Sequence, residues 1–453
     1  MTQVAVMSSV AAREADTASP GIPSSVEPLG TLFVGAALIY LGIYALEGAI
    51  RYGLYLLGKD NLILARDALI IGPLVLLFVA QAMRLRVHPA FWVAGTIFGF
   101  HGLVLMGTIG SAMGVIYGVK VLMNLLFGFF AASSLVRPSD KVLRVFVLIW
   151  FITLLGACVD KAGVTFPWTG IKTVVGDLDV DVSKDWQIED PLSRRVAGFT
   201  RSSIAIAAMM PPLAIVMMTR VRGLLLRFVI ATVSVISVAL TTQKGALFAF
   251  LPISAILCLK PPSQLGWIKA LCLIFVVLSA ALPLTTWNLH ISHGTGVFST
   301  ESLYLRIADT WPDAIEWICR HQMSLFGVGL GGIGGPQRVY APDSFNPADN
   351  IVILLYAFFG IFAALYVAII CFAVLRTTDE SHQGAVPAIA IIAFAFGYGT
   401  VLSILENQVM TLFLGAAFGM LCAATLQTNP LKMQLSRTPV VRIRNAANSH
   451  YFT

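Results

Sequence analysis

Long apolar runs follow one another along almost the entire chain, and this pattern leaves few folds open. Hydrophobic residues make up 57% of the 453 residues and charged residues only 12%, with a mean hydropathy of +0.84. A water-soluble domain has no need of so much apolar surface, and many runs approach the roughly 20 residues that cross a bilayer as a helix. The sequence therefore predicts an all-α, polytopic membrane protein.

Hydropathy predicts about twelve membrane-spanning helices between a polar start and a basic end. The predicted spans lie near residues 30–50, 67–83, 90–109, 112–135, 142–158, 203–218, 224–242, 245–259, 266–287, 350–375, 386–405 and 409–427. Residues 1–28 are rich in Ala, Ser and Pro, which predicts a disordered segment. Residues 29–427 are predicted to form one transmembrane domain, followed by a basic tail at 428–453.

The basic residues of the short loops predict the orientation of the spans. With twelve spans they fall on one side, together with both termini: Arg84, Arg86, Arg137, Lys141, Arg144, Arg220, Arg222, Lys260, Lys269 and Arg376, and in the tail Lys432, Arg437, Arg442 and Arg444. The positive-inside rule makes that side cytoplasmic. Two long loops, about 159–202 and 288–349, then face outward. The net charge of +7 includes no long basic tract, which favours anionic lipid over nucleic acid as a contact.

Several cationic residues lie in these outward-facing segments, where the positive-inside rule disfavours them. They are Arg194, Arg195, Arg201, Lys244, Arg306, Arg320 and Arg338. A bound anion such as pyrophosphate would compensate for that cost, and the arginine fork matches phosphate oxygens bidentately. Snorkelling to lipid phosphates explains any single residue equally well, but the group as a whole favours an anion site.

Three segments share their order and spacing with a known family. The first is S-R-R-V-A-G-F-T-R-S-S-I-A-I-A, from Ser193 to Ala207, and the second is A-L-T-T-Q-K-G-A-L-F-A-F, from Ala239 to Phe250. The third contains Arg306, then G-V-G-L-G from Gly327, then the Asp349-Asn350 pair that opens the next span. Together they resemble the O-antigen polymerase and O-antigen ligase superfamily of bacterial envelope glycosyltransferases, over roughly residues 190–375.

The resemblance implies a GT-C-like membrane enzyme that works without metal or cofactor at the periplasmic face of the bacterial inner membrane. Such an enzyme transfers a glycan from undecaprenyl pyrophosphate to an acceptor hydroxyl. In a polymerase the acceptor is another lipid-linked repeat unit, and the product is exopolysaccharide or O-antigen; in a ligase the acceptor is lipid A core. The implied partners are the lipid-linked donor and acceptor, membrane lipid, a chain-length regulator and a flippase.

Glycosyl transfer needs a stabilised leaving pyrophosphate and a deprotonated acceptor oxygen. We expect Arg194 or Arg195 to perform the first task, with Arg306 and Lys244 assisting. Asp349 acts either as the base or as a group that orients the acceptor, and burial or a nearby arginine can tune its pKa. Further candidates for substrate binding are Arg201, Lys244, Arg338, Asn350, Gly327, Gly329 and Glu406. The family's His-Asn pair reads Asp-Asn here, so a histidine-based mechanism is in doubt. An ordinary helix N-cap stays open as the role of Asp349.

Two other patterns in the outer loops are weaker, and one function of another class stays open. Asp177, Asp179 and Asp181 suggest a metal site, but Val182 and Ile188 stand where a calcium loop needs Gly and Glu, so a solvated acidic loop is favoured. The glycine run from Gly327 has no strand context for dinucleotide binding and favours close backbone packing at a cavity. A transporter of lipid-linked oligosaccharide is the alternative, although charged outer loops without repeat symmetry favour the transferase.

Overall fold

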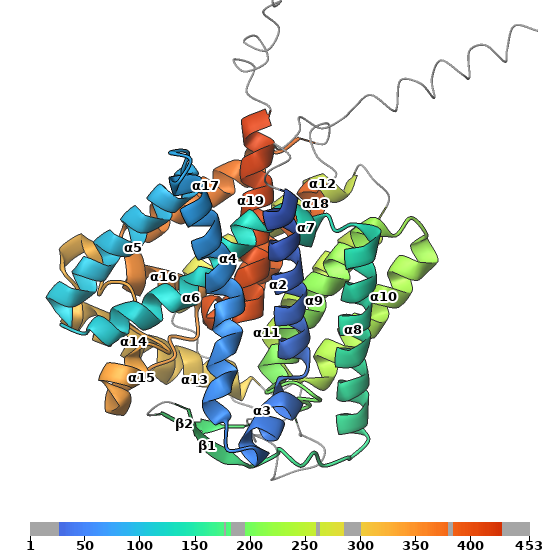
Figure 1. The fold of residues 1–453 in the computed structure, drawn as a ribbon, viewed down its shortest axis with the longest axis horizontal. Coiled ribbons are helices and arrows are strands. Elements are labelled where there is room, and N and C mark those ends of the chain that lie inside the picture. The colour runs from blue at the N-terminus through green and yellow to red at the C-terminus, as the bar shows by residue number, and fades with distance from the viewer. Residues whose placement is uncertain are drawn as a thin grey trace, which may run out of the picture.

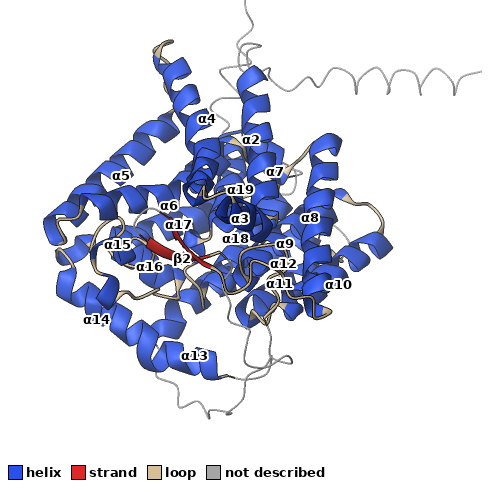
Figure 2. Ribbon diagram, turned by 60° about the horizontal axis from the view of Figure 1, so that its bottom comes forward, coloured by secondary structure: helices blue, strands red, loops and turns tan. Residues whose placement is uncertain are grey.

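The structure, a computed structural model, describes residues 27–175, 178–182, 195–259, 263–284, 300–378 and 384–427. This part of the chain is helical apart from one two-stranded hairpin (Figures 1 and 2). The longer helices are α2 (Glu27–Ala45), α3 (Glu47–Leu56), α4 (Ala65–Ala82), α5 (Pro89–Thr108), α6 (Ala112–Phe130), α8 (Asp140–Lys161), α9 (Ser203–Arg220), α10 (Leu224–Leu240), α11 (Lys244–Leu257), α12 (Ser263–Ala281), α14 (Trp311–His321), α16 (Ile351–Phe359), α17 (Phe362–Arg376), α18 (Ala385–Gly399) and α19 (Gln408–Gln427). The short ones are α7 (Ala132–Val136), α13 (Glu301–Leu305) and α15 (Gln337–Tyr340).

Each predicted span falls on an apolar helix, but fewer than twelve helices are long enough to cross a membrane unaided. Within the described ranges, six pass on length and composition, and a seventh if α2 and α3 count as one bent span. The six are Asp60–Ala82, Pro89–Thr108, Ala112–Phe130, Asp140–Lys161, Ser203–Arg220 and Ser263–Leu284. The remaining predicted spans coincide with the shorter apolar helices α10, α11, α17 and α18 and with the segment Gln408–Ala423 of α19. The multi-pass class is thus supported at the level of about six or seven crossings.

Two predicted spans are not continuous helices. The first, 30–50, bends by 78° between α2 and α3. The span predicted at 350–375 is broken between α16 and α17 at Gly360, which has φ +56°. A Cβ at Gly360 would lie 2.0 Å from the carbonyl oxygen of Leu325, so the chain turns there against another backbone. Prediction of a single helix was therefore wrong at both positions, because hydropathy records apolarity and not tertiary contact.

A β-hairpin interrupts the first long outer loop. Strands β1 (Lys172–Val175) and β2 (Leu178–Asp181) pair antiparallel, with Lys172 opposite Asp181 and Val175 opposite Leu178. The predicted all-α class holds, because this short hairpin is the one departure from helix and loop within the described residues. Part of the acidic stretch predicted to be a solvated loop is strand β2. The hairpin lies near α3 at one end of the molecule (Figure 1).

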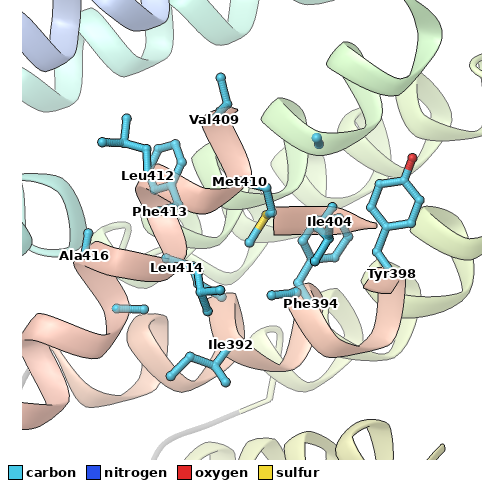
Figure 3. Packing of buried hydrophobic residues seen from close by; sticks show 14 of the residues in the cluster. Ile392, Phe394, Tyr398, Ile404, Val409, Met410, Leu412, Phe413, Leu414 and Ala416 are labelled. Atoms are coloured by element: carbon cyan, nitrogen blue, oxygen red, sulfur yellow. The ribbon is translucent and has the colours of Figure 1, made fainter. Parts of the chain in front are cut away.

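The helices at the centre of the molecule differ sharply from those around them. All residues of α18 except Val386 are buried, and they pack against α19 through side chains such as Phe394, Met410 and Phe413 (Figure 3). The surrounding helices instead expose large apolar side chains, among them Trp92, Leu103, Leu225, Trp267 and Val277. An apolar exterior around an apolar core is the pattern expected of a protein surrounded by lipid.

The described chain begins and ends at the same end of the molecule, where α2 starts and α19 finishes (Figure 1). The start of α8 and the end of α9 meet there, since Arg220 Nη2 lies 3.5 Å from Asp140 Oδ1. The opposite end holds α3, the hairpin and α13 (Figure 1). The parts of both long loops that the structure describes therefore share one end with the α2–α3 bend.

Candidate active site

A buried carboxylate holds the segment that leads into α9. Asp160 Oδ2, near the end of α8, accepts hydrogen bonds from the backbone amides of Ala197 and Gly198, both at 2.8 Å. Gly198 has φ +57°, and a Cβ there would lie 2.7 Å from the carbonyl carbon of Gly156, so a larger residue cannot fit without displacing α8. Asp160 thereby fixes the position of Arg195 at the start of this segment. Arg194 lies outside the described residues.

Arg306 and Asp349 form an ion pair between the two halves of the second long loop. Arg306 Nη2 lies 3.0 Å from Asp349 Oδ2, with the side chains 22% and 19% exposed. Arg306 Nη1 donates to the carbonyl oxygen of Ser302 at 2.7 Å. Arg306 also opens the π-helical turn η3 (Arg306–Thr310), and such turns often occur at functional sites. Two residues predicted as catalytic are thus in contact and remain accessible to solvent.

The helix cap proposed as an alternative role for Asp349 belongs to its neighbour. Asn350 Oδ1 accepts from the amides of Val352 and Ile353 at 2.8 and 3.0 Å, and its Nδ2 donates to the carbonyl oxygens of Ser279 and Thr400. The amide of Asn350, fully buried, is thus committed to joining α16 to the ends of two other helices. The side chain of Asn350 therefore has little hydrogen-bonding capacity left for the substrate binding predicted for it.

The backbone at Asp349 is strained. Ala348 and Asp349 have φ values of +60° and +44°, a region that residues other than glycine rarely occupy. Trp311 Nε1 donates to the carbonyl oxygen of Asp349 at 3.3 Å and helps to hold it there. Strain of this kind persists only where the surroundings impose it, and it concentrates at functional sites. The turn presents the carboxylate of Asp349 to Arg306.

Two further cations stand close to this ion pair. Burial, followed by the charge of Arg306, lowers the pKa of Arg195. Lys244, the first residue of α11, lies within range of the charges of Arg195 and Glu301. We call Arg195, Lys244, Arg306 and Asp349 the Asp349 cluster. It brings together three cations and the carboxylate of Asp349 from distant parts of the sequence, with a second carboxylate, Glu301, within range of Lys244.

The buried phenol of Tyr398, at the end of α18, lies within electrostatic range of the Asp349 cluster. It is 1% exposed and within range of the charges of Arg306, Asp349 and Arg195. Its Oη donates to Gln243 Oε1 at 3.3 Å, and Gln243 Nε2 donates to Ser203 Oγ at 3.2 Å. This chain of hydrogen bonds joins α18 to the turn before Lys244 and to the start of α9. The sequence offered no signal for Tyr398, which is one of many aromatic residues in apolar runs.

Comparison with known proteins finds no relative of this chain. It matches no protein-family model, no curated protein and no solved structure. A proposal of its function therefore rests on the residues themselves.

The other predicted site residues lie elsewhere. Gly327 and Gly329 are buried, and a Cβ at these positions would meet the backbone of Tyr356 at 2.6 Å and of Leu105 at 2.3 Å respectively. The glycine run is thus a tightly packed segment between α5, α6 and α16, as the sequence favoured. The glycines pack against the backbone of these helices rather than against the cations of the Asp349 cluster. Glu406 accepts a hydrogen bond from the amide of Gly335, at the end of that run.

Two of the predicted cationic residues also have other surroundings. Arg338 lies over the ring of Phe345, with its Cζ 4.0 Å from the ring centroid. Arg201 belongs to a second group of charges at the bend between α2 and α3. It shares the segment of Arg195 but lies within range of Glu47, Arg51 and Arg66 instead.

That second group, which we call the Glu47 cluster, was not predicted. It consists of Glu47, Arg51, Arg66 and Arg201. Glu47 Oε1 lies 2.7 Å from Arg51 Nη2, and Glu47 Oε2 lies 3.0 Å from Arg66 Nη1, with the carboxylate side chain 4% exposed. Arg66 Nη2 also donates to Gln408 Oε1 at 2.6 Å. A signal was present, because Glu47 and Arg51 are ionisable residues near the end of a predicted span, spaced for contact on one helix face.

The Asp349 cluster has the groups that a substitution at an activated ester requires. Its cations can hold an anionic leaving group in a partly dehydrated setting, where charge interactions are stronger than in water. Its carboxylate can accept a proton. Within the described residues, no three His, Cys, Asp or Glu side chains come together to hold a metal ion.

Proposed function

We propose that the chain is a glycosyltransferase that uses a polyprenyl-pyrophosphate-linked glycan as donor, most consistently as a polysaccharide polymerase. The observation that carries this proposal is the contact of Arg306 with Asp349 beside Arg195 and Lys244. Cations for a pyrophosphate and a carboxylate for a proton meet at one partly exposed place. The resemblance of three segments to the O-antigen polymerase and ligase superfamily supports the same activity.

In the proposed reaction, the oxygen of the acceptor hydroxyl forms a bond to the anomeric carbon of the donor. The bond from that carbon to the pyrophosphate oxygen breaks, and its electron pair leaves with the polyprenyl pyrophosphate. Arg195, Lys244 and Arg306 stabilise the charge that develops on this leaving group. Asp349 takes the proton of the acceptor hydroxyl as general base.

The same proposal includes twelve crossings of the bacterial inner membrane, with both termini cytoplasmic. A helix of 15 residues, the length of α17 and α18, spans only about 22 Å, at 1.5 Å per residue. Such helices cross a hydrocarbon core of about 30 Å only where the bilayer thins or where flanking turns enter it. The nearly complete burial of α18 supports this, since protein rather than lipid surrounds its ends. The Asp349 cluster would then face the periplasm.

The test is turnover by the purified full-length protein in nanodiscs. The substrate is a repeat unit linked to undecaprenyl pyrophosphate, supplied with EDTA, and the products are separated by length on a gel. A ladder of lengthening lipid-linked glycan is expected. Arg195→Ala and Arg306→Ala should each lower the rate by roughly 100-fold or more, the order of loss seen when one electrostatic contact to a developing charge is removed.

Arg320→Gln is the matched control, because Arg320 is 70% exposed and pairs with Glu316 on its own helix, away from the Asp349 cluster. Its turnover should equal that of the unchanged protein. Normal ladders from both arginine variants, with normal abundance, would refute the role of the cations. Transfer only onto a lipid A core acceptor would favour the ligase instead.

One observation favours a transporter as a second candidate. Transporters often place charged residues at broken helices, and the α2–α3 bend carries Glu47 and Arg51. The bend lies at one end of the molecule, however, and not at its middle (Figure 1). Movement of the lipid-linked unit across sealed vesicles without any glycan ladder would select the transporter.

A further inference from the structure

A segment of the second long loop lies alongside a helix of membrane-spanning length. That helix, α5, is long and apolar enough to cross a membrane. The amide of Leu330 in the loop donates to the carbonyl oxygen of His101 in α5 at 2.9 Å. The rings of Phe326 and Phe100 lie 5.4 Å apart between their centroids. His101 lies two helical turns before the end of α5, about 10 Å along its axis. The loop segment therefore runs along α5 rather than beyond its end.

The part of α5 that this segment contacts has an apolar, exposed surface. Leu103 is 73% exposed, and Met106 is exposed as well. The whole helix, Pro89–Thr108, contains no Asp, Glu, Lys or Arg. A helix that exposes large apolar side chains and has no charge is expected to lie among lipid acyl chains. The loop segment, which lies beside it, belongs at the same depth.

The turn that precedes the glycine run extends this apolar surface. Leu325 is 61% exposed, and Met323 is exposed beside it. The amide of Ile361, an exposed residue at the break between α16 and α17, donates to the carbonyl oxygen of Leu325 at 2.8 Å. Phe326 stacks on Phe362 of α17 with 6.1 Å between ring centroids. The turn thus joins the exposed faces of α5 and α17 into one apolar surface, which favours contact with a membrane.

The backbone of this segment is paired as membrane depth requires. Unpaired N–H and C=O groups are costly in hydrocarbon, so irregular backbone occurs there only where protein covers it. The amides of Met323 and Phe326 donate to the carbonyl oxygens of Gly327 and Met323, both at 2.9 Å. The amide of Val328 donates to the carbonyl oxygen of Ala357 in α16 at 2.8 Å. The glycine run itself is buried. These bonds suit the segment to apolar surroundings.

Charged residues on α14 mark where the apolar surface ends. Glu316 and Arg320 form an exposed ion pair, which needs water or lipid headgroups. The acyl-chain region therefore begins after His321, where α14 ends. At the other end of α14, Trp311 donates to the carbonyl oxygen of Asp349. The 11 residues of α14 cover about 16 Å at 1.5 Å per residue, so the Asp349 cluster lies close to the membrane surface.

We propose that Met323–Phe326 is a re-entrant turn, which returns from the outer loop into the outer leaflet and contacts its acyl chains. Through α14 the turn holds the Asp349 cluster near headgroup depth, where the pyrophosphate of a lipid-linked donor is presented. That consequence for the donor rests on the proposed function. The depth of the turn does not, because it depends on α5, α16 and α17 alone.

The test measures depth with spin labels on the full-length protein in phospholipid nanodiscs. The six native cysteines are replaced by alanine, and one label is attached at Leu325→Cys. Leu103→Cys on α5 is the control that faces lipid, and Glu316→Cys on α14 is the control that faces water. Collisions with oxygen, which concentrates among acyl chains, are compared with collisions with a water-soluble nickel chelate. The oxygen-to-nickel ratio at Leu325→Cys should match that at Leu103→Cys and exceed that at Glu316→Cys.

Two other results would overturn the proposal. A ratio equal to that at Glu316→Cys would place the turn in water. Few collisions with either reagent would show that protein, such as a second copy of the chain, covers it.

A second measurement leaves the native cysteines in place. A benzophenone side chain that replaces Leu325 should form a phospholipid adduct on illumination, seen as a shift in mass, and one that replaces Glu316 should form none. Absence of the adduct at position 325 would contradict the re-entrant turn. Both measurements are made without substrate, so the turn can be refuted while glycan turnover is observed, and the reverse.

Discussion

At the scale of single residues, the chemistry depends on how one strained turn places two adjacent side chains. Asn350 uses its amide to cap α16 and to hold two neighbouring helix ends. Asp349, with its left-handed backbone, faces Arg306 instead. The sequence alone could not show which of the two residues caps α16 and which faces Arg306, because Asp and Asn are both good N-caps. The division depends on a φ value that only tertiary contacts determine.

Asp349→Asn should lower glycan turnover by about 100-fold or more, the usual scale for loss of a general base. The unfolding temperature should change little, since Asn tolerates the left-handed region as well as Asp does and still offers Arg306 a hydrogen-bond acceptor. Turnover from the nanodisc assay and thermal unfolding measure the two effects. Asp343→Asn, at an exposed position on the same loop, is the control. Unchanged turnover in Asp349→Asn would show that the Asp349 side chain is a partner of Arg306 and not a general base.

At the scale of elements, hydropathy located the apolar helices but not their breaks. The run at 350–375 was longer than one crossing needs, and it breaks at Gly360, where φ is positive and the next amide, of Ile361, donates to the carbonyl oxygen of Leu325. The hairpin at 172–181 has β-branched residues and a central Gly-Asp, which is a hairpin signal, but the acidic residues favoured a loop. The Glu47 cluster was missed because its members come from α3, α4 and the segment before α9, and pairing across elements is not visible in hydropathy.

Two glycines with positive φ allow the energetic cost of backbone strain to be measured apart from the cost of overpacking. Gly163 (φ +91°) has open space where a methyl group would go, whereas a methyl group at Gly329 (φ +106°) would meet the backbone of Leu105. Gly163→Ala should cost roughly 1–2 kcal/mol of unfolding free energy from the left-handed backbone alone. Gly329→Ala should cost that amount plus about 1–3 kcal/mol for overpacking between helices. Denaturant titration measures both, and equal losses would show that the glycine run is loosely packed.

At the scale of the whole molecule, the sequence and the structure agree on a multi-pass helical protein with both described ends together. They differ on how many helices reach across. Composition predicted apolar helices. It could not show that α9 and α18 are enclosed by protein while α5 and α12 expose their apolar faces. That sorting depends on which helices meet, and similar hydropathy is compatible with many arrangements.

The proposed twelve crossings predict which thiols a membrane-impermeant maleimide reaches in intact cells. Cys319, exposed on α14, should react from outside because it lies on the same loop as the Asp349 cluster. A cysteine at position 222, made by Arg222→Cys in a variant without Cys158 and Cys319, both of which are exposed, should react only after the cells are permeabilised. The extent of labelling is read by a shift in gel mobility. Labelling of position 222 in intact cells, or protection of Cys319, would contradict this topology.

The segment held by Asp160 has a consequence for anion binding at the Asp349 cluster. Asp160 binds the backbone amides of Ala197 and Gly198, which follow Arg195 closely in the chain, so the free energy of placing Arg195 depends on a carboxylate that the ligand does not touch. Linkage requires this effect to be equal in both directions: the factor by which the contact of Asp160 raises anion affinity is also the factor by which a bound anion stabilises that contact.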